Sequence, residues 1–183
     1  MKRILLFAFL ITIAFPSYSQ SIAYREEKDG IVTTATSRMT TRAFSHERIG
    51  IALYIASDQT TNVKSVLLDF LYELDKTYTQ KGSRAIIKTF TGDIIKLVQN
   101  TNDDTVSKYR EQSDETLDLY FINVQYLTDE KTLNKLINEG IQKIRIETLT
   151  GLRDYVFKND VLGGYLKSEH NLIIQNNDFS ANF

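Results

Sequence analysis

The chain has 183 residues, of which 22 are basic and 23 acidic, and it contains one proline and no cysteine. Without cysteine there are no disulfide bonds, no thiol catalysis and no cysteine-ligated metal, so an ordinary apolar core must hold the fold together. Because nucleic-acid-binding proteins favour a basic face, the slightly acidic balance argues against nucleic acid as a partner.

The first twenty residues have the layout of a secretory signal peptide. Two basic residues precede an apolar run from Ile4 to Phe15, and Pro16 and two nearby serines follow it. The run is shorter than the roughly 20 residues of a membrane-spanning helix. We therefore expect residues 1–20 to be a cleaved signal peptide. Residues 21–183 are expected to form one globular domain, in the periplasm or outside the cell, without a membrane span.

Alternating apolar side chains indicate strands in the first part of this expected domain. Residues 31–44 are rich in threonine and suit a solvated edge strand, although a threonine face that binds a polysaccharide is an alternative. Residues 50–56 alternate with period 2. Residues 64–75 fit a helical stripe and a strand equally well. We favour a strand, because the short turn at 80–83 leads directly into the next strand.

A hairpin, a polar loop and another strand are expected next. In residues 85–98, two short strands meet at Thr91-Gly92-Asp93, where glycine accepts the positive φ of a tight turn. Residues 99–115 are too polar to build a core and are predicted to form a loop. The aromatic and β-branched residues of 116–126 again favour a strand.

The segment 129–139 has the signals of a short helix. Thr128 can cap its N-terminus, acidic residues follow in the first turn, where the helix dipole favours them, and leucines recur at helical spacing. Gly140 suits the left-handed residue that ends a helix. The predicted helix is therefore bounded at both ends.

A second helix is expected near the C-terminus. Asp160 can cap it, and apolar residues between Val161 and Ile173 form a stripe. The pair Gly163-Gly164 would cost roughly 1 kcal/mol per residue relative to alanine. Residues 176–183 are expected to fray.

The segment between the two expected helices carries an alternating row of charges. Ile144 and Ile146 face one side of a strand, and Lys143, Arg145 and Glu147 face the other. Such a strand cannot lie at the centre of a parallel sheet, where both faces are buried. We therefore expect an α+β fold on a largely antiparallel sheet with one wet face. The charged row is interpreted as this wet face, and the alternative is a binding site for an anionic glycan or a partner protein.

No pattern of residues predicts catalysis, a cofactor or a metal site. His46 and His170 lie in no metal-binding pattern, and no serine lies in a G-x-S-x-G elbow. Asn102-Asp103-Asp104 lacks the glycine and glutamate of a calcium loop. Asp114 and Glu115 could form a carboxylate pair for sugar hydrolysis, but adjacent side chains on a strand point apart.

The layout of residues 85–148 resembles that of uncharacterised exported proteins of Bacteroidetes-type bacteria. It rests on I-K-T-F-T-G-D-I-I-K-L at 87–97 and on L-T-D-E-K-T-L-N-K-L-I-N-E-G-I-Q-K-I-R-I-E at 127–147. The end of the signal, S-Y-S-Q, is also similar to theirs. The resemblance implies export and the same order of hairpin, loop, strand, helix and charged strand, but no activity and no catalytic residue.

These observations predict an exported, non-catalytic protein that binds a partner protein or a component of the cell envelope. A small periplasmic hydrolase, with Asp, Glu or His residues gathered by the fold, is the alternative. A third hypothesis is an interaction module whose exposed sheet edge pairs with another protein.

Overall fold

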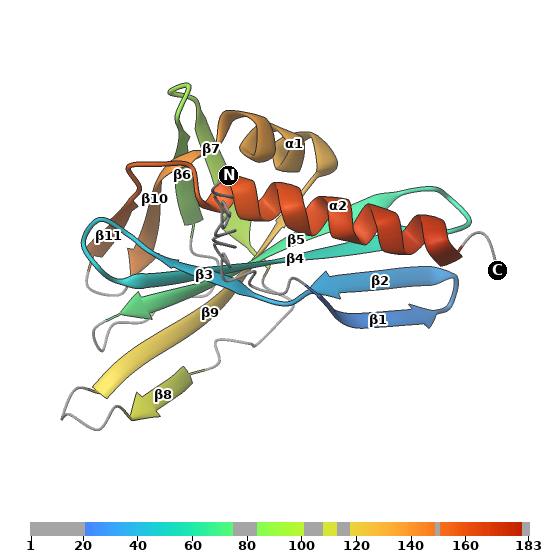
Figure 1. Cartoon of the computed structure of the whole chain (residues 1–183), viewed down its shortest axis with the longest axis horizontal. Coiled ribbons are helices and arrows are strands. Elements are labelled where there is room, and N and C mark those ends of the chain that lie inside the picture. The colour runs from blue at the N-terminus through green and yellow to red at the C-terminus, as the bar shows by residue number, and fades with distance from the viewer. Residues whose placement is uncertain (1–20, 75–83, 101–107, 113–117, 149–150, 181–183) are drawn as a thin grey trace, which may run out of the picture.

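The computed structural model of the chain describes residues 21–74, 84–100, 108–112, 118–148 and 151–180. In these residues, eleven strands form one sheet and two helices pack against it (Figure 1). The strands are β1 (Ile22–Lys28), β2 (Ile31–Thr36), β3 (Met39–Arg42), β4 (Arg48–Asp58), β5 (Lys64–Leu74), β6 (Arg84–Thr89), β7 (Ile94–Gln99), β8 (Lys108–Gln112), β9 (Asp118–Thr128), β10 (Ile141–Thr148) and β11 (Gly151–Val156). The helices are α1 (Glu130–Glu139) and α2 (Leu162–Ser180).

Every described strand pairing is antiparallel. The order across the sheet is β1-β2-β4-β5-β9-β7-β6-β10-β11, with β3 also pairing with β4 and β8 with β9. Strand β9 joins the two halves: it runs beside β5 along most of its length, but meets β7 only through Tyr126 and Leu127. Strands β7, β6, β10 and β11 therefore form one end of the sheet.

The predicted α+β class is wrong, because the fold is a β-rich antiparallel sheet with two helices. More of the chain forms strands, with side chains alternating between the two faces of the sheet, than the sequence predicted. Strand β5, for which a helix was the alternative, buries Val66, Leu68 and Phe70 on one face, as only a strand does with this spacing. The predicted loop 99–115 contains β8, and its residues 101–107 and 113–115 lie outside the described part of the chain.

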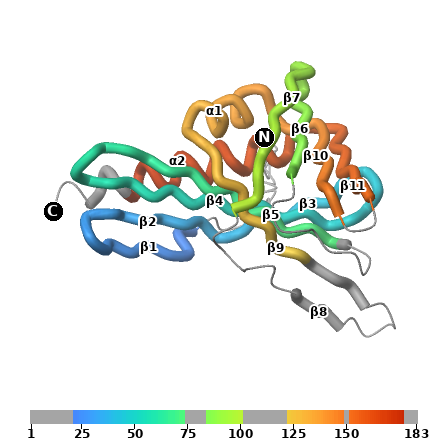
Figure 2. The backbone as a smooth tube through the Cα atoms, turned by 180° about the vertical axis from the view of Figure 1, so that it is seen from behind, coloured from blue at the N-terminus to red at the C-terminus, as the bar shows by residue number. Residues whose placement is uncertain are grey.

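One face of the sheet carries the core, and both helices cover this face. Helix α2 runs along β4 and β2 with α1 beside it, as Figures 1 and 2 show. The centroid of the Phe70 ring lies 5.7 Å from that of Tyr72 and 5.9 Å from that of Tyr126. The fully buried core residues include Ile49, Ile51, Leu53, Leu68, Phe70, Tyr72, Tyr126, Leu133, Leu136, Ile144, Ile146 and Leu166. We call the opposite face, which the helices leave uncovered, the outer face.

The predicted hairpin and the first predicted helix are present. Gly92 has a φ of +98° in the turn between β6 and β7, and Gly140 has a φ of +70° at the end of α1. The cap of α1 is Asp129 rather than Thr128, because the Asp129 carboxylate accepts a hydrogen bond from the N–H of Thr132 at 2.6 Å. An N-cap carboxylate satisfies a backbone donor that no carbonyl of the helix can reach.

Asp160 fixes the start of α2, as the sequence predicts, and also ties it to the start of β10. Its carboxylate accepts hydrogen bonds from the N–H of Gly163 at 2.9 Å and of Ile141 at 3.0 Å. A Cβ atom at Gly140 or at Gly163 would lie 2.5 Å from this carboxyl group. The close approach explains why the helix tolerates a glycine that otherwise weakens it. Helix α2 continues to Ser180, so the predicted fraying is wrong for 176–180, and 181–183 lie outside the described residues.

Candidate functional site

Strand β10 has the two-sided character that the sequence predicts. Ile144 and Ile146 are fully buried, whereas Lys143 and Arg145 are partly exposed and Glu147 is exposed on the outer face. Strands β6 and β11 flank β10 on either side. The charged row therefore lies on the wet side of a paired, internal strand.

Asp154 of β11 holds two of the three charged residues. The Lys143 Nζ lies 2.6 Å from Asp154 Oδ2, the Arg145 Nε donates to Oδ1 at 2.6 Å, and Arg145 Nη2 donates to Oδ2 at 2.8 Å. These contacts, chiefly that of Arg145, lower the pKa of the Asp154 carboxyl to about 2, and Asp154 raises the pKa of Arg145 in return. The cross-strand pairing accounts for Lys143 and Arg145 structurally.

Three further cations share the outer face with this row. Arg84 and Lys88 of β6 flank Ile86, and Lys96 of β7 lies directly opposite Ile86 in the strand register. All three cations are exposed, and none forms an ion pair with another described residue. They form what we call the basic face, which consists of Arg84, Lys88, Lys96, Lys143 and Arg145 with the acidic Glu147 and Asp154.

The charge of the basic face differs in sign from that of the chain. Five basic and two acidic residues give this face a net charge of +3, whereas the chain as a whole has −1. Lys88 also lies directly opposite Lys143 in the register of β6 and β10. Like charges in this position weaken a sheet. Cross-strand pairing with Lys143 therefore does not account for Lys88.

Exposed aliphatic side chains lie between the charges. Ile94 and Val98 of β7 and Leu152 and Val156 of β11 are on the same outer face and are 40–61% exposed. Val98 is paired in register with Leu127 of β9, which is also exposed. The outer face at this end of the sheet is thus both cationic and apolar.

The cations of β6 and β7 were not among the predicted site residues, although the sequence contains a signal for them. In R-A-I-I-K at 84–88 and I-I-K-L-V at 94–98, the period of 2 puts the basic residues on one face of each strand and the buried Ala85, Ile87 and Leu97 on the other. What the sequence could not show is that these strands are neighbours of β10, so that three separate patterns form one surface.

A cleft of about 240 Å³ lies beside the turn between β3 and β4. Two glutamates, Glu47 and Glu73, line this cleft. Glu73 already accepts hydrogen bonds from Arg48, from the backbone N–H at 2.8 Å and from Nε at 3.2 Å, and the Tyr155 hydroxyl donates to the Glu73 carbonyl oxygen at 2.9 Å. The lining residues are Ser45, Glu47, Glu73, Leu152, Arg153, Asp154 and Tyr155.

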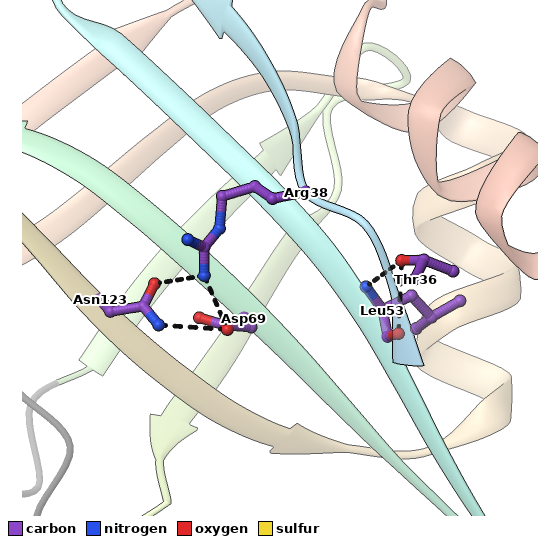
Figure 3. A network of polar contacts seen from close by, with 5 residues as sticks. All are labelled: Thr36, Arg38, Leu53, Asp69 and Asn123. Carbon is purple, nitrogen blue, oxygen red and sulfur yellow. Dashed lines mark hydrogen bonds and ion pairs between the residues drawn. The ribbon is translucent and has the colours of Figure 1, made fainter. Parts of the chain in front are cut away.

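A polar network crosses the middle of the outer face (Figure 3). Arg38 Nη2 donates to Asp69 Oδ2 at 2.8 Å and to Asn123 Oδ1 at 2.7 Å, and Asn123 Nδ2 donates to Asp69 Oδ2 at 3.2 Å. The Asp69 side chain is 1% exposed, and burial raises its pKa although Arg38 and Asn123 oppose this rise. A Cβ at Gly50 would lie 2.8 Å from the Arg38 Cδ, so the network depends on a glycine beneath the arginine. It links β5 and β9 to the segment that connects β2 with β3.

The residues considered for catalysis or metal binding do not come together. His46 lies in the β3–β4 turn and His170 on α2, and neither lines the cleft. Among the residues that the structure describes, no group of three His, Cys, Asp or Glu side chains could hold a metal ion. The ranges 102–104 and 114–115 lie outside these residues. Neither described helix is long and apolar enough to cross a membrane.

Comparison with protein-family models, curated proteins and solved structures gives no match to this chain. The resemblance to exported proteins of Bacteroidetes-type bacteria therefore stays a prediction.

Proposed function

We propose that this chain is an exported, non-catalytic protein that binds a partner protein or a component of the cell envelope through its basic face. The observation that supports the proposal is the group of three exposed cations, Arg84, Lys88 and Lys96, without an ion-pair partner among the described residues. They add to the paired Lys143 and Arg145 on an otherwise acidic chain. A patch of one sign attracts ligands of the opposite sign and speeds their association.

The shape of the basic face favours binding over catalysis. Active sites are concave and hold their groups in fixed positions, where water is excluded. The basic face lies on the exposed surface of a sheet, and its unpaired cations are long, flexible side chains. Such a surface can attract an extended anionic ligand, but it cannot orient a reacting bond.

A small hydrolase is the second candidate function, because Glu47 and Glu73 line one cleft. Chromogenic ester and glycoside substrates test it, with Glu47→Gln and Glu73→Gln as variants. We expect no turnover by the parent protein, because the Glu73 carboxylate is already occupied by two hydrogen bonds from Arg48. Turnover that either variant abolishes would establish the hydrolase instead.

Reversing two charges of the basic face is expected to abolish binding to washed bacterial cell envelopes. The pair Lys88→Glu and Lys96→Glu changes the net charge of the face from +3 to −1. Since each cation near an anionic surface contributes about 1 kcal/mol, loss of two should weaken binding at least about 25-fold. Co-sedimentation measures the bound fraction, and binding by the parent should fall when salt is raised from about 50 mM to about 500 mM.

The matched control carries the same change of charge elsewhere. Lys131 on α1 and Lys167 on α2 are exposed on the helices, away from the basic face, so Lys131→Glu with Lys167→Glu should bind like the parent. Equal losses in both double variants would show that net charge alone governs binding. No binding by the parent at low salt would contradict an envelope component as ligand, and cross-linking in cells would then test for a protein partner.

A further inference from the structure

The mixture of cations and aliphatic side chains on the basic face narrows the chemistry of its ligand. A surface that binds a soluble polyanion needs only cations and gains nothing from exposed aliphatic side chains. Ile94, Val98, Leu152 and Val156 are 40–61% exposed between and beside them. Exposed aliphatic side chains gathered on one face mark a surface that contacts apolar material. The ligand should therefore offer negative charge and apolar groups together.

The spacing of the cations indicates a surface rather than one anionic group. Same-face residues two apart on a strand are separated by about 6.6 Å, and neighbouring strands by about 4.8 Å. Arg84 and Lys88 therefore lie about 13 Å apart on β6, with Lys96 between them on β7. Long, flexible side chains at such distances are not held in place around one phosphate, but they can each meet a separate headgroup.

We propose, building on the function above, that the basic face binds the surface of an anionic phospholipid membrane. The lysine and arginine side chains reach the phosphates, while the aliphatic residues enter the boundary between headgroups and acyl chains. Lipid headgroups move laterally, so they can accommodate Lys88, which lies opposite Lys143 and has no ion-pair partner among the described residues.

The same features fit a protein partner less well. Lysine is depleted from the buried cores of protein interfaces, and each unpaired cation would need a matching carboxylate on a rigid partner. A soluble anionic polysaccharide would match the charges but would leave the four aliphatic residues in water. The membrane surface is the ligand that accounts for both kinds of side chain.

Flotation with protein-free vesicles tests the inference. The parent should bind vesicles of phosphatidylcholine containing about a third phosphatidylglycerol, and not vesicles of phosphatidylcholine alone. Because each cation strengthens binding to an anionic surface about fivefold, Lys88→Glu with Lys96→Glu should weaken it at least about 25-fold. The pair Lys131→Glu and Lys167→Glu, with the same charge change on the helices, should bind like the parent.

A second double variant separates a membrane from a soluble polyanion. Ile94→Ser with Val98→Ser removes two exposed aliphatic side chains and leaves every charge in place. It should lose vesicle binding several-fold but keep the parent's affinity for dextran sulfate. Equal affinities of this variant and the parent for vesicles would contradict the inference.

Failure of this inference can be told apart from failure of the proposed function. Charge-dependent binding to envelopes without any binding to anionic vesicles would reject the lipid surface and leave the binding function standing. If protease treatment of the envelopes then abolished binding, the partner would be a protein. Absence of binding to both envelopes and vesicles would count against the lipid surface and the envelope component alike.

Discussion

Replacing Glu169 by glutamine is expected to stabilise the protein by about 3 kcal/mol at pH 7. Glu169 lies on the face of α2 that packs on the sheet, and it is 0% exposed. Neither of its carboxyl oxygens has a hydrogen-bond partner among the described residues. The nearby Thr36 hydroxyl exchanges hydrogen bonds with the backbone of Leu53 instead (Figure 3). A buried charge without a partner is costly, so the group stays protonated.

The sign of the pH dependence follows from the two pKa values. Burial raises the pKa of Glu169 from 4.5 to about 9, and Thr36 and Arg38 offset only part of this rise. Below pH 4.5 both the folded and the unfolded chain carry the proton, so the group costs nothing. Between 4.5 and 9 the folded chain holds more protons, so the free energy of unfolding falls as the pH rises. pH 7 lies 2.5 pH units above 4.5, and each unit lowers the free energy of unfolding by about 1.4 kcal/mol. The buried carboxyl group therefore costs the parent about 3 kcal/mol of stability at pH 7.

Denaturant unfolding at a series of pH values measures this effect. The free energy of unfolding of Glu169→Gln should exceed that of the parent by almost nothing at pH 4. This difference should grow through neutral pH and level off above pH 9. Glu27→Gln, at an exposed position on β1, is the matched control and should follow the parent throughout. If the Glu169→Gln and parent curves run parallel from pH 5 to 9, the carboxyl group is ionised in the folded protein.

Replacing Arg38 by methionine is expected to destabilise the protein by about 3 kcal/mol. The change removes the only cation that pairs with the Asp69 carboxylate among the described residues, and this carboxylate is 1% exposed. Breaking a buried ion pair by removing one member typically costs 3–5 kcal/mol, because the remaining charge is uncompensated. Burial already raises the pKa of Asp69, and loss of the arginine should raise it further. The loss of stability in Arg38→Met should therefore be small at pH 3, where Asp69 is protonated, and reach its full size at neutral pH.

Urea unfolding of a double-mutant cycle tests this account. Adding Asp69→Asn to Arg38→Met removes the unpaired charge and should restore part of the lost stability. Arg25→Met on β1, exposed and outside the network, controls for loss of an arginine and should change stability by less than about 0.5 kcal/mol. A cost for Arg38→Met no larger than for Arg25→Met would contradict the role of the guanidinium.

The sequence contains most of the local structure of this protein. Alternation of isoleucine with charge predicts both faces of β10, Gly92 predicts the β6–β7 turn, and Gly140 predicts the end of α1. These signals are local, because each depends on a residue and its near neighbours in the chain. The error at the α1 cap, Asp129 in place of Thr128, is a shift of one residue.

Features that depend on pairing between distant strands could not be predicted. The sequence does not show that β9 lies between β5 and β7, or that Lys88 faces Lys143. Glu169 stands in the polar stretch S-E-H-N, which indicates a solvated helix face, yet the packing of α2 buries it. The fold class was wrong because more of the chain forms strands than its local patterns indicated, including β8 inside the predicted loop.

Site-specific fluorescence tests most directly whether the basic face is where the protein binds. The chain has no cysteine, so a single one at Val98 on the face or at Lys131 on α1 can be labelled with an environment-sensitive dye. With washed cell envelopes at low salt, the dye at position 98 should shift to the blue, and the dye at position 131 should not change. A shift at 131 with none at 98 would place the contact on the helices and contradict the account.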